Sequence, residues 1–225
     1  RLHGRVTRLY FTPLIRSLQQ VAGAHPLLTF LDSFRYPLAG EFAMVRDLAW
    51  INRVPGDWGL EVGVLSEIYR NCALRRICQA DIADAYEHKH QGLSADNAEQ
   101  GLQKMCVDIT KSLFRNLASE GVVLSEGVLK TLRATYLQSA QEAITRYQND
   151  AAINSLQFDR HAERMAVEVF LKGMKIATEA FLEDPLGVPM ISNWSRVTGA
   201  IPDVFERLIG AVERDHDWDP VGDRV

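Results

Sequence analysis

Four residues near the start of the sequence are suited to holding an anion: Gly4, Arg5, Val6 and Thr7. They lead into a segment with helical apolar spacing over residues 7–20, so we expect them at a helix N-terminus. Unpaired N–H groups and a partial positive charge at such an end favour a phosphate or carboxylate, and the Arg5 guanidinium adds a forked donor. The alternative is a helix start with a solvated arginine.

A second cluster combines Trp58 and Glu61 with Gly59 and Gly63. An aromatic face packs against the C–H surface of a sugar, and a carboxylate accepts hydrogen bonds from its hydroxyl groups. Glu61 falls on the first turn of an apolar helical face, where an uncompensated buried carboxylate is costly. This pattern predicts a sugar contact. A helix-start glutamate beside a surface tryptophan is the other interpretation.

Two further segments carry candidate ligand groups. Leu38 and Gly40 precede a helix expected over residues 41–52, and a glycine there lets the backbone approach a ligand closely. His88 and His90 are two residues apart, so in an extended chain both imidazoles share a face and suit a divalent metal. A loop-to-helix junction and a pair of surface histidines are the respective alternatives.

Different elements are expected in the two parts of the chain. Residues 1–93 form a mixed, motif-bearing segment, with strands predicted over 33–37 and 74–82 and a helical face after Leu60. Residues 94–225 form a helical extension: one helix ends at Gly121, Ser125 and Asp159 cap two more, and a shorter one covers 203–214. Because one or two strands are too few for a sheet, we expect a sheet-bearing half upstream of residue 1.

Composition excludes several classes of function. The chain has 225 residues, of which 47% are hydrophobic, and its net charge of −4 gives no general attraction to nucleic acid. It contains no uncharged apolar run of the roughly 18 residues that span a bilayer. Its three cysteines are irregularly spaced, so a disulfide framework is not expected. We therefore expect a cytoplasmic protein with no nucleic-acid or membrane partner.

The order and separation of these clusters resemble the C-terminal half of the glucosyl-3-phosphoglycerate synthases. The resemblance implies an α/β fold: the C-terminal part of a GT-A (nucleotide-sugar, Rossmann-like) glycosyltransferase with a mainly α-helical C-terminal extension. It implies that Gly4, Arg5, Val6 and Thr7 hold the phosphoglycerate acceptor. It also implies transfer of glucose, with retention, from a nucleoside diphosphate glucose to 3-phosphoglycerate.

The same resemblance implies roles for the other clusters. Leu38 and Gly40 lie near the transferring sugar, and Glu61 contacts the donor glucose, with an aromatic residue at the position of Trp58. His88 completes a Mg²⁺ or Mn²⁺ site with an Asp-x-Asp motif upstream of Gly4.

Tyr86 and His90 stand where another branch of the family has arginine and asparagine, at positions that contact the donor phosphate and the acceptor. The helical extension is expected to pack on the catalytic half or to build a homodimer. Two alternatives stay open: transfer of mannose or another sugar to a small phosphorylated or carboxylic acceptor, and a non-catalytic helical interaction or dimerisation module.

Overall fold

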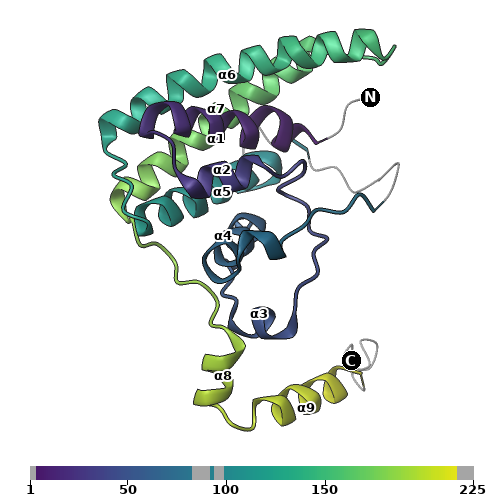
Figure 1. Ribbon diagram of the computed structural model, residues 1–225, viewed down its shortest axis with the longest axis vertical. Coiled ribbons are helices and arrows are strands. Elements are labelled where there is room, and N and C mark those ends of the chain that lie inside the picture. The colour runs from purple at the N-terminus through teal and green to yellow at the C-terminus, as the bar shows by residue number, and fades with distance from the viewer. Residues whose placement is uncertain (1–3, 83–91, 94–98, 217–225) are drawn as a thin grey trace, which may run out of the picture.

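The computed structural model describes residues 4–82, 92–93 and 99–216, and these residues fold into helices joined by loops (Figure 1). A π-helical turn, η1 (Thr7–Phe11), continues into α1 (Thr12–Ala22). The others follow in chain order: α2 (Pro26–Asp32), α3 (Arg46–Ile51), α4 (Leu60–Asn71), the 3₁₀ turn η2 (Leu74–Arg76), α5 (Gly101–Ser119), α6 (Glu126–Ile153), α7 (Arg160–Glu183), α8 (Trp194–Ala200) and α9 (Val204–His216).

The first helix keeps its course through a proline because another helix supplies the missing hydrogen bond. Pro13 has no N–H to donate to the carbonyl of Leu9, four residues earlier. The Tyr136 hydroxyl of α6 donates to that carbonyl at 3.0 Å, and the backbone widens into a π-turn at the same place. The predicted helix over residues 7–20 is confirmed, and α1 is tied to α6.

The sequence predicts the starts of α6 and α7 and the end of α5, while α6 runs to Ile153, beyond the end predicted at Tyr147. The Ser125 hydroxyl accepts from the N–H of Val128 at 3.4 Å, and the Asp159 carboxylate accepts from that of Ala162 at 2.9 Å, so both are N-caps. After α5, Gly121 takes a φ of +87°, which only glycine adopts without strain, and the chain turns away.

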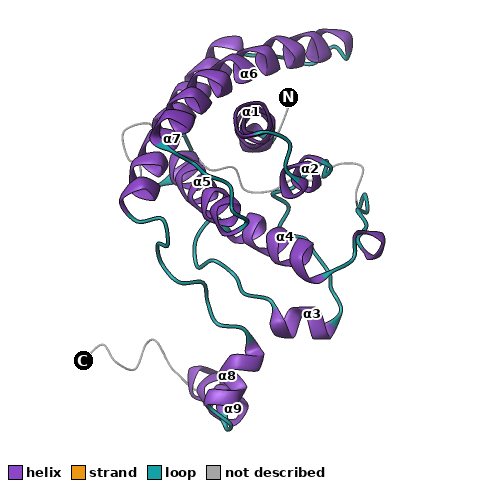
Figure 2. Cartoon of the chain, turned by 60° about the vertical axis from the view of Figure 1, so that its left-hand side comes forward, coloured by secondary structure: helices purple, strands orange, loops and turns teal. Residues whose placement is uncertain are grey.

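One hydrophobic core joins both parts of the chain. Figure 2 shows α1 inside the curve of α6, α7 and α5. Tyr10 lies at the centre, with its ring 5.5 Å from that of Tyr136 and 5.4 Å from that of Phe170. Residues on either side of position 93 thus share a core. The boundary predicted there stays a prediction.

Both predicted strands are wrong, and the part of the chain that the structure describes is mostly helical and does not show the α/β fold. Residues 33–40 form turns and bends, and residues 74–82 form η2 followed by an irregular segment. A strand needs a neighbour to pair its N–H and C=O groups, and no described segment pairs with these two. The only pairing among residues 4–82, 92–93 and 99–216 is one antiparallel bridge between Val54 and Ile191.

The helix expected over residues 41–52 is also shorter than predicted, since α3 covers only Arg46–Ile51. It contacts α8, which the sequence analysis did not anticipate, and the rings of Trp50, Trp194 and Phe205 stack at 5.4–6.2 Å. With α9, these helices form a lower layer in which no residue is buried. No helix in the described ranges is long and apolar enough to cross a membrane.

Candidate functional site

The Gly4–Thr7 segment lies at a helix N-terminus, as expected. Gly4 has a φ of +69°, and a Cβ there would approach the ring of Tyr36 to 3.0 Å, so two constraints favour glycine. The first helical hydrogen bond runs from the Arg8 N–H to the Gly4 carbonyl at 2.9 Å, which leaves the preceding N–H groups at the helix end. The side chains of Val6 and Thr7 are buried, so these two residues can offer a ligand only their backbone.

Arg5 is held by a glutamate from a distant helix. Its Nε and Nη2 atoms both lie 3.1 Å from Oε1 of Glu163 on α7. The other carboxylate oxygen of Glu163 accepts from Nη2 of Arg8, also at 3.1 Å. The guanidinium of Arg8 also stacks over the ring of Tyr147 on α6, 4.7 Å from its centroid. The helix start is therefore held by contacts to α6 and α7.

The two glycines beside Glu61 are explained by packing. A Cβ on Gly59 would lie 2.6 Å from Cβ of Ser112 on α5, and one on Gly63 would lie 2.3 Å from Cδ of Pro55. Glycine lets α4 approach α5 and the preceding loop this closely. The glycine spacing therefore does not by itself indicate a ligand.

Glu61 has no such structural explanation. It is half-buried on the first turn of α4, and burial raises the pKa of its carboxyl above the usual value, partly opposed by a hydrogen bond to its own backbone. Within the described ranges, no ion pair reaches this carboxylate, whereas the neighbouring buried Glu67 pairs with Arg53 and Arg70 at 3.2 and 3.0 Å. Trp58, three residues before it, is 40% exposed.

Leu38 and Gly40 differ in their surroundings. Leu38 is partly buried and packs against the hydrophobic core, while Gly40 is exposed and a Cβ there would meet no heavy atom within 4 Å. Four predicted site residues can be compared here: Leu38, Gly40, Arg5 and Glu61. Among the described residues, no hydrogen bond or ion pair connects any two of these four. The fold places Arg5 against α7, whereas the predicted sugar-contact cluster (Trp58, Gly59, Glu61 and Gly63) lies at the start of α4.

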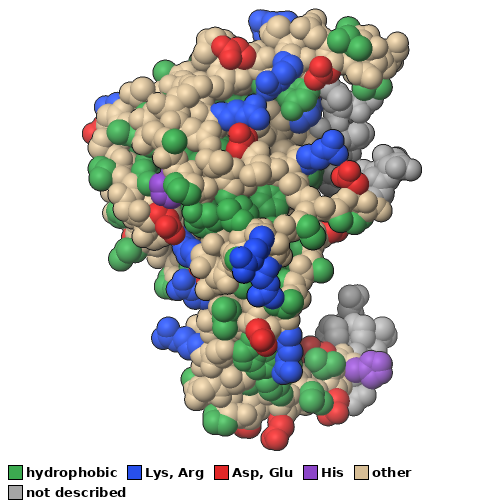
Figure 3. Space-filling model, viewed as in Figure 1, with side chains coloured by type: hydrophobic (Ala, Val, Ile, Leu, Met, Phe, Trp, Pro, Cys, Tyr) green, Lys and Arg blue, Asp and Glu red, His purple; other side chains and the backbone are tan. Residues whose placement is uncertain are grey.

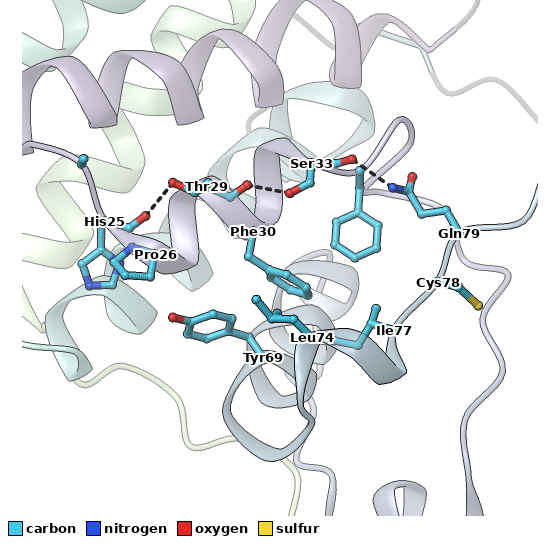
Figure 4. Close-up of a pocket in the computed structure, with 12 residues that line it drawn as sticks. His25, Pro26, Thr29, Phe30, Ser33, Tyr69, Leu74, Ile77, Cys78 and Gln79 are labelled. Atoms are coloured by element: carbon cyan, nitrogen blue, oxygen red, sulfur yellow. Dashed lines mark hydrogen bonds between the residues drawn. The ribbon is translucent and has the colours of Figure 1, made fainter.

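A pocket of about 570 Å³ lies between α2, α4 and the segment after η2. Apolar side chains gather on this face (Figure 3), and Phe30, Tyr69 and Leu74 point into the hollow (Figure 4). Its Gln79 is engaged at both ends: Nε2 donates to the Ser33 carbonyl at 2.9 Å and Oε1 accepts from a backbone N–H. None of the lining residues is a predicted site residue or a Lys or Arg, so this pocket does not suit a phosphorylated acceptor.

Tyr86, His88 and His90 lie outside the described residues. Elsewhere in the chain, over the ranges that the structure describes, no group of three or more His, Cys, Asp or Glu side chains could hold a metal ion. The predicted metal role of His88 stays a prediction.

Glu163 is the residue that the sequence reasoning missed. The buried face of α7 includes Ala166, Val167, Phe170 and Met174, and Glu163 occupies the same face one turn earlier. A charged residue on an otherwise apolar stripe was the available signal, because such a residue needs a partner inside the fold.

Comparison with known proteins shows what kind of enzyme this chain resembles. Its relatives are enzymes that make a glucosylated compound, and two of them carry one name, glucosyl-3-phosphoglycerate synthase. The protein of Persephonella marina is 51% identical over 219 residues, which are 97% of this chain and 54% of that protein. The protein of Methanococcoides burtonii is 42% identical over 211 residues, which are 93% of this chain and 51% of that protein.

The resemblance inferred from the sequence clusters is thereby confirmed, and it extends through the helical part. The chain spans about half the length of the curated relatives it matches. No protein-family model and no solved structure matches it.

Proposed function

We propose that the polypeptide carrying this chain transfers a glucosyl group from a nucleoside diphosphate glucose to 3-phosphoglycerate, which yields glucosyl-3-phosphoglycerate. The supporting observation is the similarity of nearly the whole chain to two synthases named for that product, at 51% and 42% identity. A shared fold alone would not support an activity, but the similarity here extends over more than 200 residues of sequence.

The proposed roles follow from the chemistry of the site. Arg5 and the N–H groups at the helix start bind the phosphate or carboxylate of the acceptor. Glu61 accepts hydrogen bonds from the glucose hydroxyl groups, and Trp58 packs against the sugar face. Because no described cation compensates Glu61, its half-buried carboxylate is more readily understood as a ligand contact than as a stabilising element.

In the proposed reaction, the bond between the sugar C1 and the diphosphate oxygen breaks. A bond from C1 to the 2-hydroxyl oxygen of the acceptor forms, and the hydroxyl proton leaves with the diphosphate. Retention at C1 follows if the acceptor attacks on the face that the diphosphate leaves, as the family resemblance implies. Holding both substrates in one geometry is the contribution of the residues named above.

A Mg²⁺ or Mn²⁺ ion is part of the proposal through His88. The described residues do not make a metal site by themselves, so the ion would need ligands from elsewhere in the polypeptide. When bound, it would supply positive charge to the departing diphosphate.

We further propose that a GT-A catalytic half, equivalent to the part of the relatives that this chain does not span, covers the lower layer. On α9, Phe205, Leu208, Ile209 and Val212 share one helical face and are 40–60% exposed. An apolar stripe of this kind normally faces a protein interior. The relatives are about twice as long as the aligned region, so in those proteins a segment of sufficient size is available to cover such a face.

The test is release of nucleoside diphosphate by the longest natural form of the polypeptide and by residues 1–225 alone. Both receive Mg²⁺, a panel of UDP- and GDP-sugars, and either 3-phosphoglycerate or no acceptor. We expect release only from the longer form, with a glucose donor and with the acceptor. In that form Arg5→Ala should raise the acceptor KM far more than the donor KM, while Arg16→Ala, which removes an exposed ion pair of α1, should change neither.

Each alternative gives a different result. Preference for a mannose donor or for another small acid would identify a related transferase. Absence of acceptor-dependent release from every donor would refute the proposed reaction. A helical interaction module that forms a homodimer would then be the better explanation of the apolar lower layer.

A further inference from the structure

The buried carboxylate of Glu163 lies where the start of the chain and the helical extension meet. Its side chain is 8% exposed, and each of its oxygens contacts a different arginine at 3.1 Å: Oε1 contacts Arg5 and Oε2 contacts Arg8. These contacts link residues more than 150 positions apart in the sequence. The ion pairs therefore exist only because α7 packs beside η1.

From this geometry we infer that Glu163 is the positioning residue that fixes the Arg5 guanidinium for the acceptor anion. The inference rests on the proposed function. Glu163 touches one edge of the guanidinium, through Nε and Nη2. Among the described residues, Nη1 of Arg5 has no hydrogen-bond partner, and the side chain is 24% exposed. One edge is thus held while the other remains accessible, which suits forked binding of a phosphate or carboxylate.

The charge of the cluster also suits an anion. The Arg5 guanidinium carries its positive charge beside a helix N-terminus, and the one carboxylate of Glu163 is shared between Arg5 and Arg8. Without Glu163, two arginines would lie close together with no carboxylate between them, and Arg5 would lose its orienting partner. The Tyr147 ring, 4.7 Å from the guanidinium of Arg8, also restrains Arg8.

Removal of the negative charge of Glu163 distinguishes two roles for this residue: it positions Arg5, or it only neutralises the positive charge of the arginines. In the longest natural form, Glu163→Gln keeps the size of the side chain and makes the cluster more positive by one charge. If Glu163 only neutralises charge, the acceptor KM should fall, because an anion would be attracted more strongly. If Glu163 positions Arg5, the acceptor KM should rise about tenfold, equivalent to about 1.4 kcal/mol, with little change in the donor KM.

The matched control is Glu179→Gln, which removes an exposed ion pair with Lys175 on the same helix and should change neither KM.

A second measurement needs no turnover. Addition of 3-phosphoglycerate should raise the Tm of the unmodified enzyme and of Glu179→Gln, and it should raise the Tm of Glu163→Gln much less. Should Glu163→Gln fail to fold, Glu163→Asp keeps the charge and withdraws the carboxylate by one methylene, and it should raise the acceptor KM by a smaller factor.

An unchanged or lowered acceptor KM in Glu163→Gln would overturn the inference, and so would an acceptor KM in Glu163→Asp equal to that of the unmodified enzyme. These outcomes differ from failure of the proposed function, in which the unmodified enzyme itself shows no acceptor-dependent release.

Discussion

Replacement of Gly63 by alanine tests why glycine occurs in the predicted sugar-contact cluster. Glycine there either allows close packing of α4 or allows a ligand to approach the backbone. Gly63 is buried in α4, and a Cβ on it would lie 2.3 Å from Cδ and 2.6 Å from Cγ of Pro55. These atoms belong to a rigid ring, so relief of the contact requires movement of the backbone of α4 or of the loop before it.

The magnitude follows from two opposed terms. Alanine gains about 1 kcal/mol over glycine in a helix interior. Overpacking of a tight core site costs about 1–3 kcal/mol and can exceed that range. A contact at 2.3 Å against a ring falls at the upper end, so we expect a net loss of roughly 1–3 kcal/mol. For a chain of this size that corresponds to a fall in Tm of roughly 2–4 °C per kcal/mol.

Thermal and urea unfolding of Gly63→Ala and of Gly127→Ala provide the measurement. Gly127 lies in the first turn of α6, where the nearest atom to an added Cβ is 3.9 Å away, so its replacement should be neutral or stabilising. If Gly63→Ala were as stable as the parent but had lost sugar transfer, the packing explanation would be wrong and backbone approach to the ligand would replace it.

Two further predictions concern the charge and the metal. Burial raises the folded-state pKa of Glu61, so ionisation of this carboxyl lowers stability as the pH rises above its unfolded value, about 4.3. Glu61→Gln should therefore raise the Tm at pH 7, lose that advantage as the pH falls towards 4, and reduce glucose transfer. An equal Tm at every pH would contradict the assignment of an unpaired carboxylate. His88→Ala should raise the Mg²⁺ concentration needed for half-maximal turnover at least roughly tenfold, as for loss of a metal-site residue. Full turnover at unchanged Mg²⁺ would remove His88 from the metal site.

Local signals in the sequence were sufficient for the long helices. Ser125 and Asp159 predict the starts of α6 and α7, and Gly121 predicts the end of α5, because a cap or a positive φ depends on a few neighbouring residues. The helix start after Gly4 was predictable for the same reason, and its anion-binding role stays a prediction. The short apolar runs 33–37 and 74–82 were misinterpreted, since periodicity over so few residues does not distinguish a strand from a turn or an irregular segment.

Contacts between residues far apart in the sequence could not be predicted from such local signals. The pattern of α7 shows Glu163 on a buried face, but only the packing of α7 beside η1 determines that its partners are Arg5 and Arg8. The close approach of Pro55 to Gly63 likewise depends on how the loop folds back over α4.

The sequence by itself therefore determined the long helices, the caps at Ser125 and Asp159 and the family resemblance, because each depends on residue types at fixed short spacing. The tertiary structure decided that Arg5 is oriented by a glutamate 158 residues away and that Glu61 has no cation beside it among the described residues. Such partners are set by which helix faces meet, and that depends on the packing of the whole core.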